Sequence, residues 1–189
     1  MSRHIVFFLE EPSAEAMLEG FLPKILPKSW YYRCVVFEGK QDLEAQIVRR
    51  LRGYNVPGAK FVILRDKDAG DCRIIKKRLI EKCTEAGKPG VLVRIACYEL
   101  ESWYLADLSA VEQGLGSSNL SRYTKQRKFS TPDEYPHPFE ILQSIAPSYQ
   151  KVGGSRSIGP YLNPDNNRSS SFAVFVSGLR KLCATRHKR

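Results

Sequence analysis

The first half of the chain alternates short apolar runs with amphipathic segments. The apolar runs are four to six residues long and almost uninterrupted, the pattern of strands covered on both faces of a sheet. The segments between them repeat their apolar residues at helical spacing. The expected strands are residues 4–9, 32–37, 61–64 and 91–96, and the expected helices are residues 13–25, 42–52 and 72–86. This order predicts an α/β fold with a mostly parallel sheet between two layers of helices.

The pattern changes after Asp107. Gly, Ser, Pro and basic residues dominate residues 114–137 and 153–171, which favours long loops there. Helical spacing returns only in residues 139–145 and 171–182. We therefore expect an α/β core over residues 1–110 and a loop-rich, basic helical extension over residues 111–189, packed on the core.

Composition narrows the class of protein. The chain has 189 residues, of which 42% are hydrophobic, close to the average of globular domains. No apolar run approaches the roughly 18 to 20 residues that cross a bilayer, and the N-terminal run lacks the pattern of a signal peptide. The five cysteines stand singly, without a CxxC pair, which argues against a zinc site and against a disulfide framework. We expect a cytoplasmic protein whose cysteines are reduced and mostly buried, with no membrane partner.

Positive charge is concentrated near the C-terminus. The net charge of the whole chain is +10, and residues 151–189 account for +7 of it, with eight Lys and Arg against Asp165 alone. The eight are Lys151, Arg156, Arg168, Arg180, Lys181, Arg186, Lys188 and Arg189. Such a distribution is typical of a face that binds a polyanion, because bound cations release the counterions of phosphates. A basic surface that serves only solubility fits the charge equally well.

Acidic residues follow three of the four expected strands. They are Glu10 and Glu11 after the first, Asp66 and Asp68 after the third, and Glu99 and Glu101 after the fourth. Because the carboxyl ends of parallel strands share one edge of the sheet, we expect these side chains to converge there. Carboxylates without a His or Cys partner are the ligands that Mg²⁺ and Mn²⁺ prefer. The pattern therefore predicts a divalent-cation site.

Each pair of acids also has a simpler interpretation. Asp66 and Asp68 fit a solvated turn, and Glu10 and Glu11 fit acids at a helix N-terminus. Glu99 and Glu101 fit ion pairs with Arg94 or with nearby lysines, and Trp103 fits the core. The coincidence of three acidic strand ends is what favours the cation site over these alternatives.

These residues resemble the motifs of the Toprim family, the metal-binding domain of topoisomerases, primases and several nucleases. The run from Phe7 to Glu15 is similar to the opening Glu-Gly-x-Thr-Glu-Glu of the nuclease members, with Glu10 on the family glutamate and Glu11 in place of the glycine. Asp66-Lys67-Asp68 after an apolar strand resembles the family's Asp-x-Asp motif. Glu99-Leu-Glu-Ser-Trp103 resembles a motif of small stand-alone Toprim-like proteins, often encoded near ATPases in defence contexts.

The resemblance implies a Toprim-like sheet and a nuclease that acts on DNA with Mg²⁺ or Mn²⁺. The implied metal ligands are Glu10, Asp66, Asp68 and Glu101, with Glu99 as a further ligand or a support for one. Lys151 is the implied lysine that stabilises charge on the phosphate. Contacts to the nucleic-acid backbone are expected from Arg156, Arg168, Arg180, Lys181, Arg186, Lys188 and Arg189.

Other functions fit the same motifs. The site is compatible with cleavage of structured RNA, with a non-catalytic subunit that binds nucleic acid or an ATPase, and less well with an aspartyl-phosphate phosphotransferase. The sequence contains no GxxxxGK[ST] motif, so any ATP hydrolysis requires a separate ATPase partner. The sequence leaves the choice between a monomer and a homodimer open.

Overall fold

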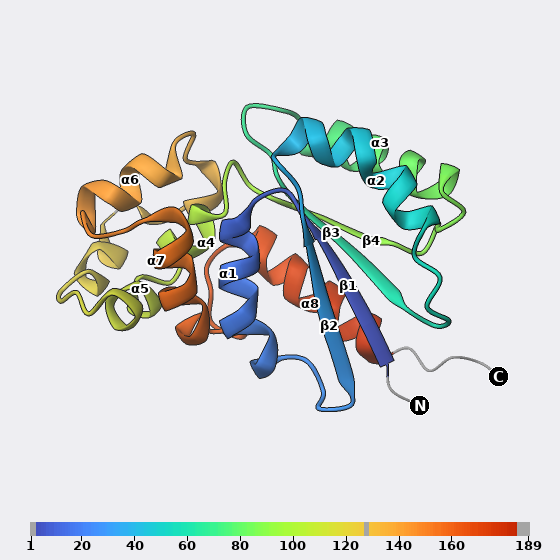
Figure 1. The fold of residues 1–189 in the computed structure, drawn as a ribbon. Helices are drawn as coiled ribbons and strands as arrows, with labels where there is room; N and C mark the ends of the chain where they lie inside the picture. Colours follow the sequence, from blue (N-terminus) through green and yellow to red (C-terminus); the bar gives the residue numbers. More distant parts are fainter. Residues whose placement is uncertain (1–2, 127–128, 185–189) are drawn as a thin grey trace.

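Four parallel strands form the centre of the computed structural model, which describes residues 3–126 and 129–184. In chain order they are β1 (Arg3–Leu9), β2 (Trp30–Val36), β3 (Lys60–Asp66) and β4 (Leu92–Ala96). Their order in the sheet is β2-β1-β3-β4 (Figure 1). The chain leaves β1 toward one side of the sheet and later returns to pair β3 on its other side, so the strand order reverses between β1 and β3. The carboxyl ends of these two strands are the usual ligand-binding position in such a sheet.

Side chains alternate between the two faces of the sheet, as the period of a strand requires. Ile5, Phe7 and Leu9 of β1 point into a core cluster that also contains side chains of α1 (Pro12–Phe21) and α8 (Ser170–Ala184). Val6 and Phe8 point into a second cluster with α2 (Lys40–Arg52) and α3 (Cys72–Glu85). The two layers of helices lie on opposite faces of the sheet in Figure 1. The expected α/β fold is confirmed.

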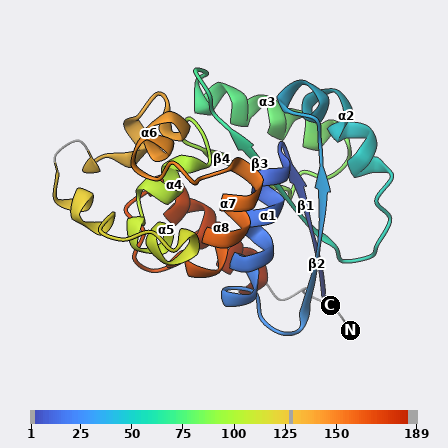
Figure 2. The ribbon, with the colours of Figure 1, turned by 60° about the vertical axis from the view of Figure 1, so that its left-hand side comes forward.

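The second half of the chain adds shorter helices beside α1. They are α4 (Glu101–Leu105), α5 (Leu108–Leu115), α6 (Pro138–Ile145) and α7 (Lys151–Ile158), with the 3₁₀ segments η2 (Ser121–Lys125), η4 (Pro132–Glu134) and η5 (Gly159–Tyr161); the segment η1 (Leu22–Lys24) follows α1. Figure 2 shows α4 to α7 gathered at one side of the sheet. The boundary expected at residue 110 falls inside α5, and the division into two segments stays a prediction.

Helix α7 corrects the loop expected over residues 153–171. Gly153 and Gly154 lower the intrinsic helix propensity of this segment, which is why the sequence pattern favoured a loop. Packing overrides that preference, because Gly154, Ser155 and Ile158 are buried against the core. Ser13 is a residue type that often caps a helix, and the sequence favours it as the N-cap of α1. The structure corrects this expectation: the helix starts at Pro12, and Glu11 is its N-cap residue. Pro fits the first helical position because its missing N–H has no partner to lose there.

The loop expected over residues 114–137 is shorter and more structured than its composition suggests. Helix α5 extends to Leu115, and η2 and η4 occupy part of the remainder. Leu120 and Phe129 are buried, and the Phe129 ring packs against Tyr123 at 5.5 Å and Tyr135 at 6.3 Å. These buried apolar side chains pack the segment against the rest of the protein, although most of it forms no regular helix or strand.

The expectations about membrane-spanning helices and about the cysteines have different outcomes. Within residues 3–126 and 129–184, none of the helices has the length and apolar character needed to span a bilayer. All five cysteines are free thiols, but only Cys83 and Cys183 are buried, and Cys72 is exposed. The expectation of mostly buried cysteines is therefore wrong, because Cys72 opens α3 on its solvent side.

Candidate metal and phosphate site

The ends of β1 and β3 are joined through a side chain. Glu10 directly follows β1, and its Oε2 accepts a hydrogen bond of 3.1 Å from the backbone N–H of Asp66 at the end of β3. The backbone N–H of Glu10 donates to the carbonyl of Leu64, which extends the pairing of the two strands. The first and second acidic motifs therefore meet where the strand order reverses.

Glu10 is a buried carboxyl group whose partners offset only part of the cost of burying its charge. It is 7% exposed, and burial raises its pKa from 4.5 to about 7. The hydrogen bond from Asp66 and the charge of Arg65, whose Nε lies 3.5 Å from Glu10 Oε2, oppose this rise. Burial is the larger effect, so the carboxyl group is only partly ionised at neutral pH.

Asp66 lies among several other acids. Burial raises its pKa well above the usual value, and the charges of Glu101, Glu10 and Glu11 raise it further. Lys151 acts in the opposite direction. Two carboxylates that repel each other in a poorly solvated site require a proton or a cation. We call the carboxyl ends of β1 and β3, where Glu10, Glu11, Asp66 and Glu101 interact, the acidic edge. Asp66 is its centre because the charges of the other three acids all act on it.

Glu101 brings the third acidic motif to the same place. It opens α4 and is 1% exposed, and its Oε1 accepts a 2.9 Å hydrogen bond from the hydroxyl of Tyr149. Burial raises the pKa of Glu101, whereas Lys151 and the Tyr149 hydroxyl lower it. Tyr149 is itself fully buried, because its ring packs against Tyr104 and Phe139.

Lys151 is the cation that faces these acids. It opens α7, its Nζ lies 3.5 Å from Glu11 Oε2, and it lies 5.5 Å from the centre of the Phe139 ring. Burial lowers the pKa of Lys151, but Glu101, Glu11, Glu99 and Asp66 together raise it above its ordinary value. The amine is therefore fully charged at neutral pH, beside the carboxylates.

Asp68 and Glu99 point to other partners. Asp68 Oδ2 accepts a 2.9 Å hydrogen bond from Lys40 Nζ at the start of α2, and its backbone adopts a left-handed φ of 52°. Glu99 Oε2 accepts a 3.0 Å hydrogen bond from the backbone N–H of Phe139 in the first turn of α6. Arg94, which the simpler interpretation offered as a partner of Glu99 and Glu101, donates to the carbonyl groups of Val93 and Val174.

The donor atoms at this edge are of the type that a hard divalent cation prefers. Every candidate ligand offers carboxylate oxygen atoms, and three of the carboxyl groups have pKa values raised by burial and mutual repulsion. In the part of the chain that the structure describes, no group of three acidic, His or Cys side chains is close enough together to hold a metal ion. Rotation of these side chains toward one another is required to form a coordination sphere.

Three of the basic residues that follow Lys151 in the sequence, Arg156, Arg168 and Arg180, bind groups other than these acids. Arg156 pairs with Glu19 of α1 at 3.3 Å, and Arg168 donates to the carbonyl groups of Leu105, Ala106 and Thr124. Arg180 pairs with Asp165 at 2.8 Å, and the adjacent Lys181 lies near the end of α8. Arg186, Lys188 and Arg189 fall outside the described residues.

Helix α8 runs away from the acidic edge. Near its start, the Ser171 hydroxyl accepts hydrogen bonds from the indole N–H of Trp103 and from the backbone N–H of Cys97, just beyond β4. Near its end, burial raises the pKa of Cys183 and the charge of Arg3, where β1 begins, opposes that rise. Figure 1 shows β1 beginning and α8 ending at the same end of the sheet. Arg180 and Lys181 thus lie toward the end opposite Asp66, and their role in binding nucleic acid stays a prediction.

Sequence reasoning missed three residues that support the site. Arg65 is the only charged side chain inside the apolar run of β3, a signal of a buried ion pair, and its Nη1 lies 2.7 Å from Glu44 Oε1. Lys40 and Tyr149, which hold Asp68 and Glu101, carry no comparable signal in the sequence, because long-range packing brings them to the acids.

Comparisons with known proteins show the family and the fold of the chain. Residues 9–180 match the model of a family described as "Domain of unknown function (DUF4276)". The fold is similar to a solved structure, the C-terminal region of the OLD protein of Burkholderia pseudomallei, with a TM-score of 0.52 and 16% sequence identity. That similarity covers 95% of this chain and 98% of the other, so the expected Toprim-like fold is confirmed. A search of curated proteins found no match.

Proposed function

The chain belongs to the DUF4276 family and has the fold of the OLD C-terminal region, and from its acidic edge we propose that it is a metal-dependent nuclease acting on DNA. The observation that carries this proposal is that buried acids and a lysine interact where the strand order reverses: Asp66 is hydrogen-bonded to Glu10 and is coupled by charge to Glu101 and Lys151. Buried acids with raised pKa values beside a cation are typical of functional sites.

Glu10, Asp66, Asp68 and Glu101 are the residues that would hold Mg²⁺ or Mn²⁺, with Glu99 at the margin. A bound divalent cation supplies a Lewis acid that polarises a phosphodiester and lowers the pKa of water. Arg65 keeps the Glu10 carboxylate at the end of β3, and Tyr149 fixes the orientation of Glu101. Asp68 is available only after its bond to Lys40 opens.

Lys151 supplies the charge that a reacting phosphate needs. Its amine is held between Glu11 and the Phe139 ring, and the surrounding acids keep it protonated. A fixed cation in a poorly solvated site stabilises the extra negative charge of the pentavalent transition state more strongly than water does. Lys40 is a second amine at the same edge, and opening of its bond to Asp68 releases it for a phosphate.

The role in a cell is proposed from the resemblance. Small Toprim-like proteins with the same Glu-x-Glu-x-Trp motif are often encoded near ATPases in defence contexts, and we propose that this chain is the nuclease effector of such a pair. The absence of a GxxxxGK[ST] motif from the sequence supports a separate ATPase.

One observation favours a second candidate function. No three acids in the described part of the chain converge on one point, which favours a non-catalytic subunit that binds nucleic acid or an ATPase. Cleavage of structured RNA would use the same residues as cleavage of DNA, so a cleavage assay is needed to distinguish the two substrates.

A cleavage assay separates these candidates. Labelled single-stranded and duplex DNA and RNA are incubated with Mg²⁺ or Mn²⁺ and either the native protein or the variant Asp66→Asn/Asp68→Asn. We expect metal-dependent cleavage of DNA that the double variant loses by at least 100-fold, about 2.7 kcal/mol of transition-state stabilisation. The matched control is Glu81→Gln/Glu85→Gln, which removes two exposed acids of α3 and leaves cleavage unchanged. No cleavage of any polymer, or equal cleavage by the native protein and the double variant, contradicts the proposal.

A further inference from the structure

Two adjoining pockets meet at Tyr54, away from the acidic edge. One has a volume of about 420 Å³ and lies between the loop that precedes β3 and the loop that precedes β4; its lining includes Asn55, Lys60, Phe61 and Lys88. The other, about 330 Å³, is lined by Arg33 of β2, by Arg49 and Arg50 of α2, and by Tyr54. We call the two together the Tyr54 groove.

The Tyr54 groove is cationic without an acidic counterpart. Five Lys and Arg line it, namely Arg33, Arg49, Arg50, Lys60 and Lys88, and no Asp or Glu does. Within the described residues, none of these five side chains forms a salt bridge; Arg49 donates to the Gln46 side chain. By contrast, Lys40 and Lys151 at the acidic edge are both paired with carboxylates. The charges of Arg49 and Arg50 contribute to lowering the pKa of Asp42, which does not line the groove. Cations without a salt-bridge partner around a concave surface favour a polyanion.

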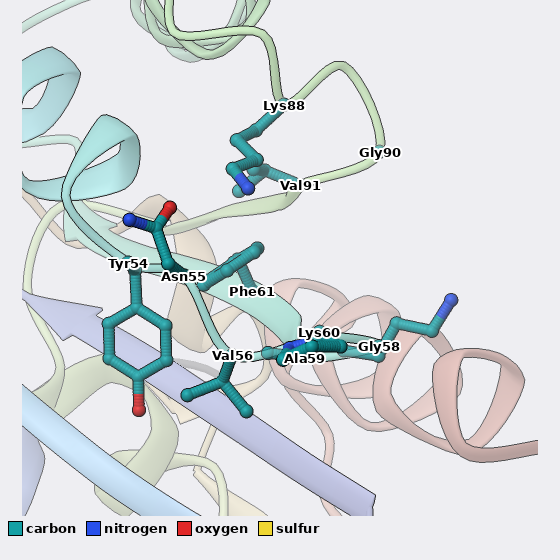
Figure 3. A pocket seen from close by; sticks show the side chains of 11 residues that line it. Tyr54, Asn55, Val56, Gly58, Ala59, Lys60, Phe61, Lys88, Gly90 and Val91 are labelled. Carbon is teal, nitrogen blue, oxygen red and sulfur yellow. The ribbon is translucent and has the colours of Figure 1, made fainter.

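Aromatic rings lie among these cations. Tyr54 lines both pockets, and its ring packs edge-on against Phe61, with an interplanar angle of 84° and 5.6 Å between centroids. Figure 3 shows Lys88 reaching toward Phe61 and Asn55, while Lys60 points outward. The Lys88 amine lies 5.5 Å from the centre of the Phe61 ring. An aromatic ring fixed beside several cations suits a chain that carries both phosphates and flat bases.

We propose that the Tyr54 groove is a second nucleic-acid contact, in which Arg33, Arg49, Arg50 and Lys88 hold phosphates of a single-stranded segment and Tyr54 stacks on a base. The proposal rests on the proposed function in one respect only: its ligand, a nucleic acid, is also the proposed substrate. The span of β3, seven residues or roughly 20 Å, separates the first pocket from the acidic edge, so a longer strand contacts both. Binding in the groove thus anchors the substrate without taking part in cleavage.

The test measures binding without metal or cleavage. A fluorescent single-stranded DNA 20-mer is titrated with the full chain in EDTA over a range of salt concentrations, and anisotropy gives the Kd. The variant Arg49→Gln/Arg50→Gln is expected to weaken binding about tenfold and to lower the salt slope by about 1.4, since each lost contact to a single strand contributes about 0.7. Tyr54→Leu is expected to weaken binding at least fivefold and to leave the salt slope unchanged, because stacking releases no counterions.

Matched variants decide whether the groove is responsible. Lys28→Gln/Lys76→Gln removes the same charge from exposed positions outside the groove and is expected to bind as the native protein does. Equal weakening by this control, native-like binding by both groove variants, or displacement of DNA by polyglutamate at equal charge concentration would overturn the proposal. Because the titration contains EDTA and measures binding alone, a failure of the cleavage assay leaves this result standing. Thermal melting confirms that each variant is folded.

Discussion

At the scale of single residues, the acidic edge places charge where water cannot fully solvate it. Glu10 and Glu101 are buried, and burial together with their charges raises the pKa of Asp66 well above its usual value. Such groups reduce the free energy of unfolding at neutral pH unless a cation or a proton compensates them. The same groups are the proposed metal ligands, which links the stability of the protein to its function.

Glu10→Gln is expected to stabilise the metal-free protein at high pH. The pKa of Glu10 is raised in the folded state from 4.5 to about 7, so its contribution to stability is complete below about pH 4.5 and is lost as the pH rises through 7. The amide never ionises and keeps an oxygen for the Asp66 N–H. In EDTA at pH 8 we expect the variant to be more stable than the native protein by about 2 to 3 kcal/mol, and at pH 4.5 to be equal.

Denaturant unfolding at both pH values measures this difference. The exposed Glu38→Gln is the control and is expected to change stability equally at both pH values. If the difference in stability between the native protein and Glu10→Gln is the same at pH 4.5 and at pH 8, Glu10 is not a buried acid with a raised pKa.

At the scale of secondary-structure elements, α7 carries Lys151 and also fixes the residue that holds Glu101. A Cβ atom added to Gly154 would overlap the ring of Tyr149, whereas one added to Gly153 would meet no atom within 4 Å. The two neighbouring glycines of α7 therefore have different roles, one in close packing and one without a neighbour.

Gly154→Ala and Gly153→Ala are expected to act in opposite directions. The first displaces Tyr149 from Glu101 and lowers the free energy of unfolding by about 1 to 3 kcal/mol. The second raises it by about 0.5 to 1 kcal/mol, because Ala loses less backbone entropy in a helix. Chemical denaturation of both variants tests this, and equal destabilisation would show that α7 does not pack on Tyr149 as described.

The elements also show what the sequence pattern can predict. The four strands and the helices between them are confirmed within a few residues, since apolar runs and helical spacing reflect burial on the sheet directly. The acids Glu10, Asp66 and Glu101 were found because parallel strands end at one edge. Helix α7 was missed because its glycines lower helix propensity, and its stability comes from contacts with α1 and Tyr149 that no local pattern encodes.

At the scale of the whole molecule, the carboxyl ends of β1 and β3 are acidic, whereas the charged residues that line the Tyr54 groove are all Lys or Arg. Arg180 and Lys181, two of the cations near the C-terminus, do not lie beside these acids, because α8 carries them toward the start of β1. The acidic edge instead has Lys40, Lys151 and Arg65 as its nearest cations.

Binding of Mn²⁺ tests the central claim, that the ends of β1 and β3 form a divalent-cation site, most directly. Isothermal titration calorimetry of the native protein, Asp66→Asn and the exposed control Asp165→Asn measures the affinity without any substrate. The account predicts saturable binding to the native protein and to Asp165→Asn, and an affinity at least tenfold lower for Asp66→Asn, about 1.4 kcal/mol. No binding to the native protein, or equal affinities for all three proteins, would contradict it.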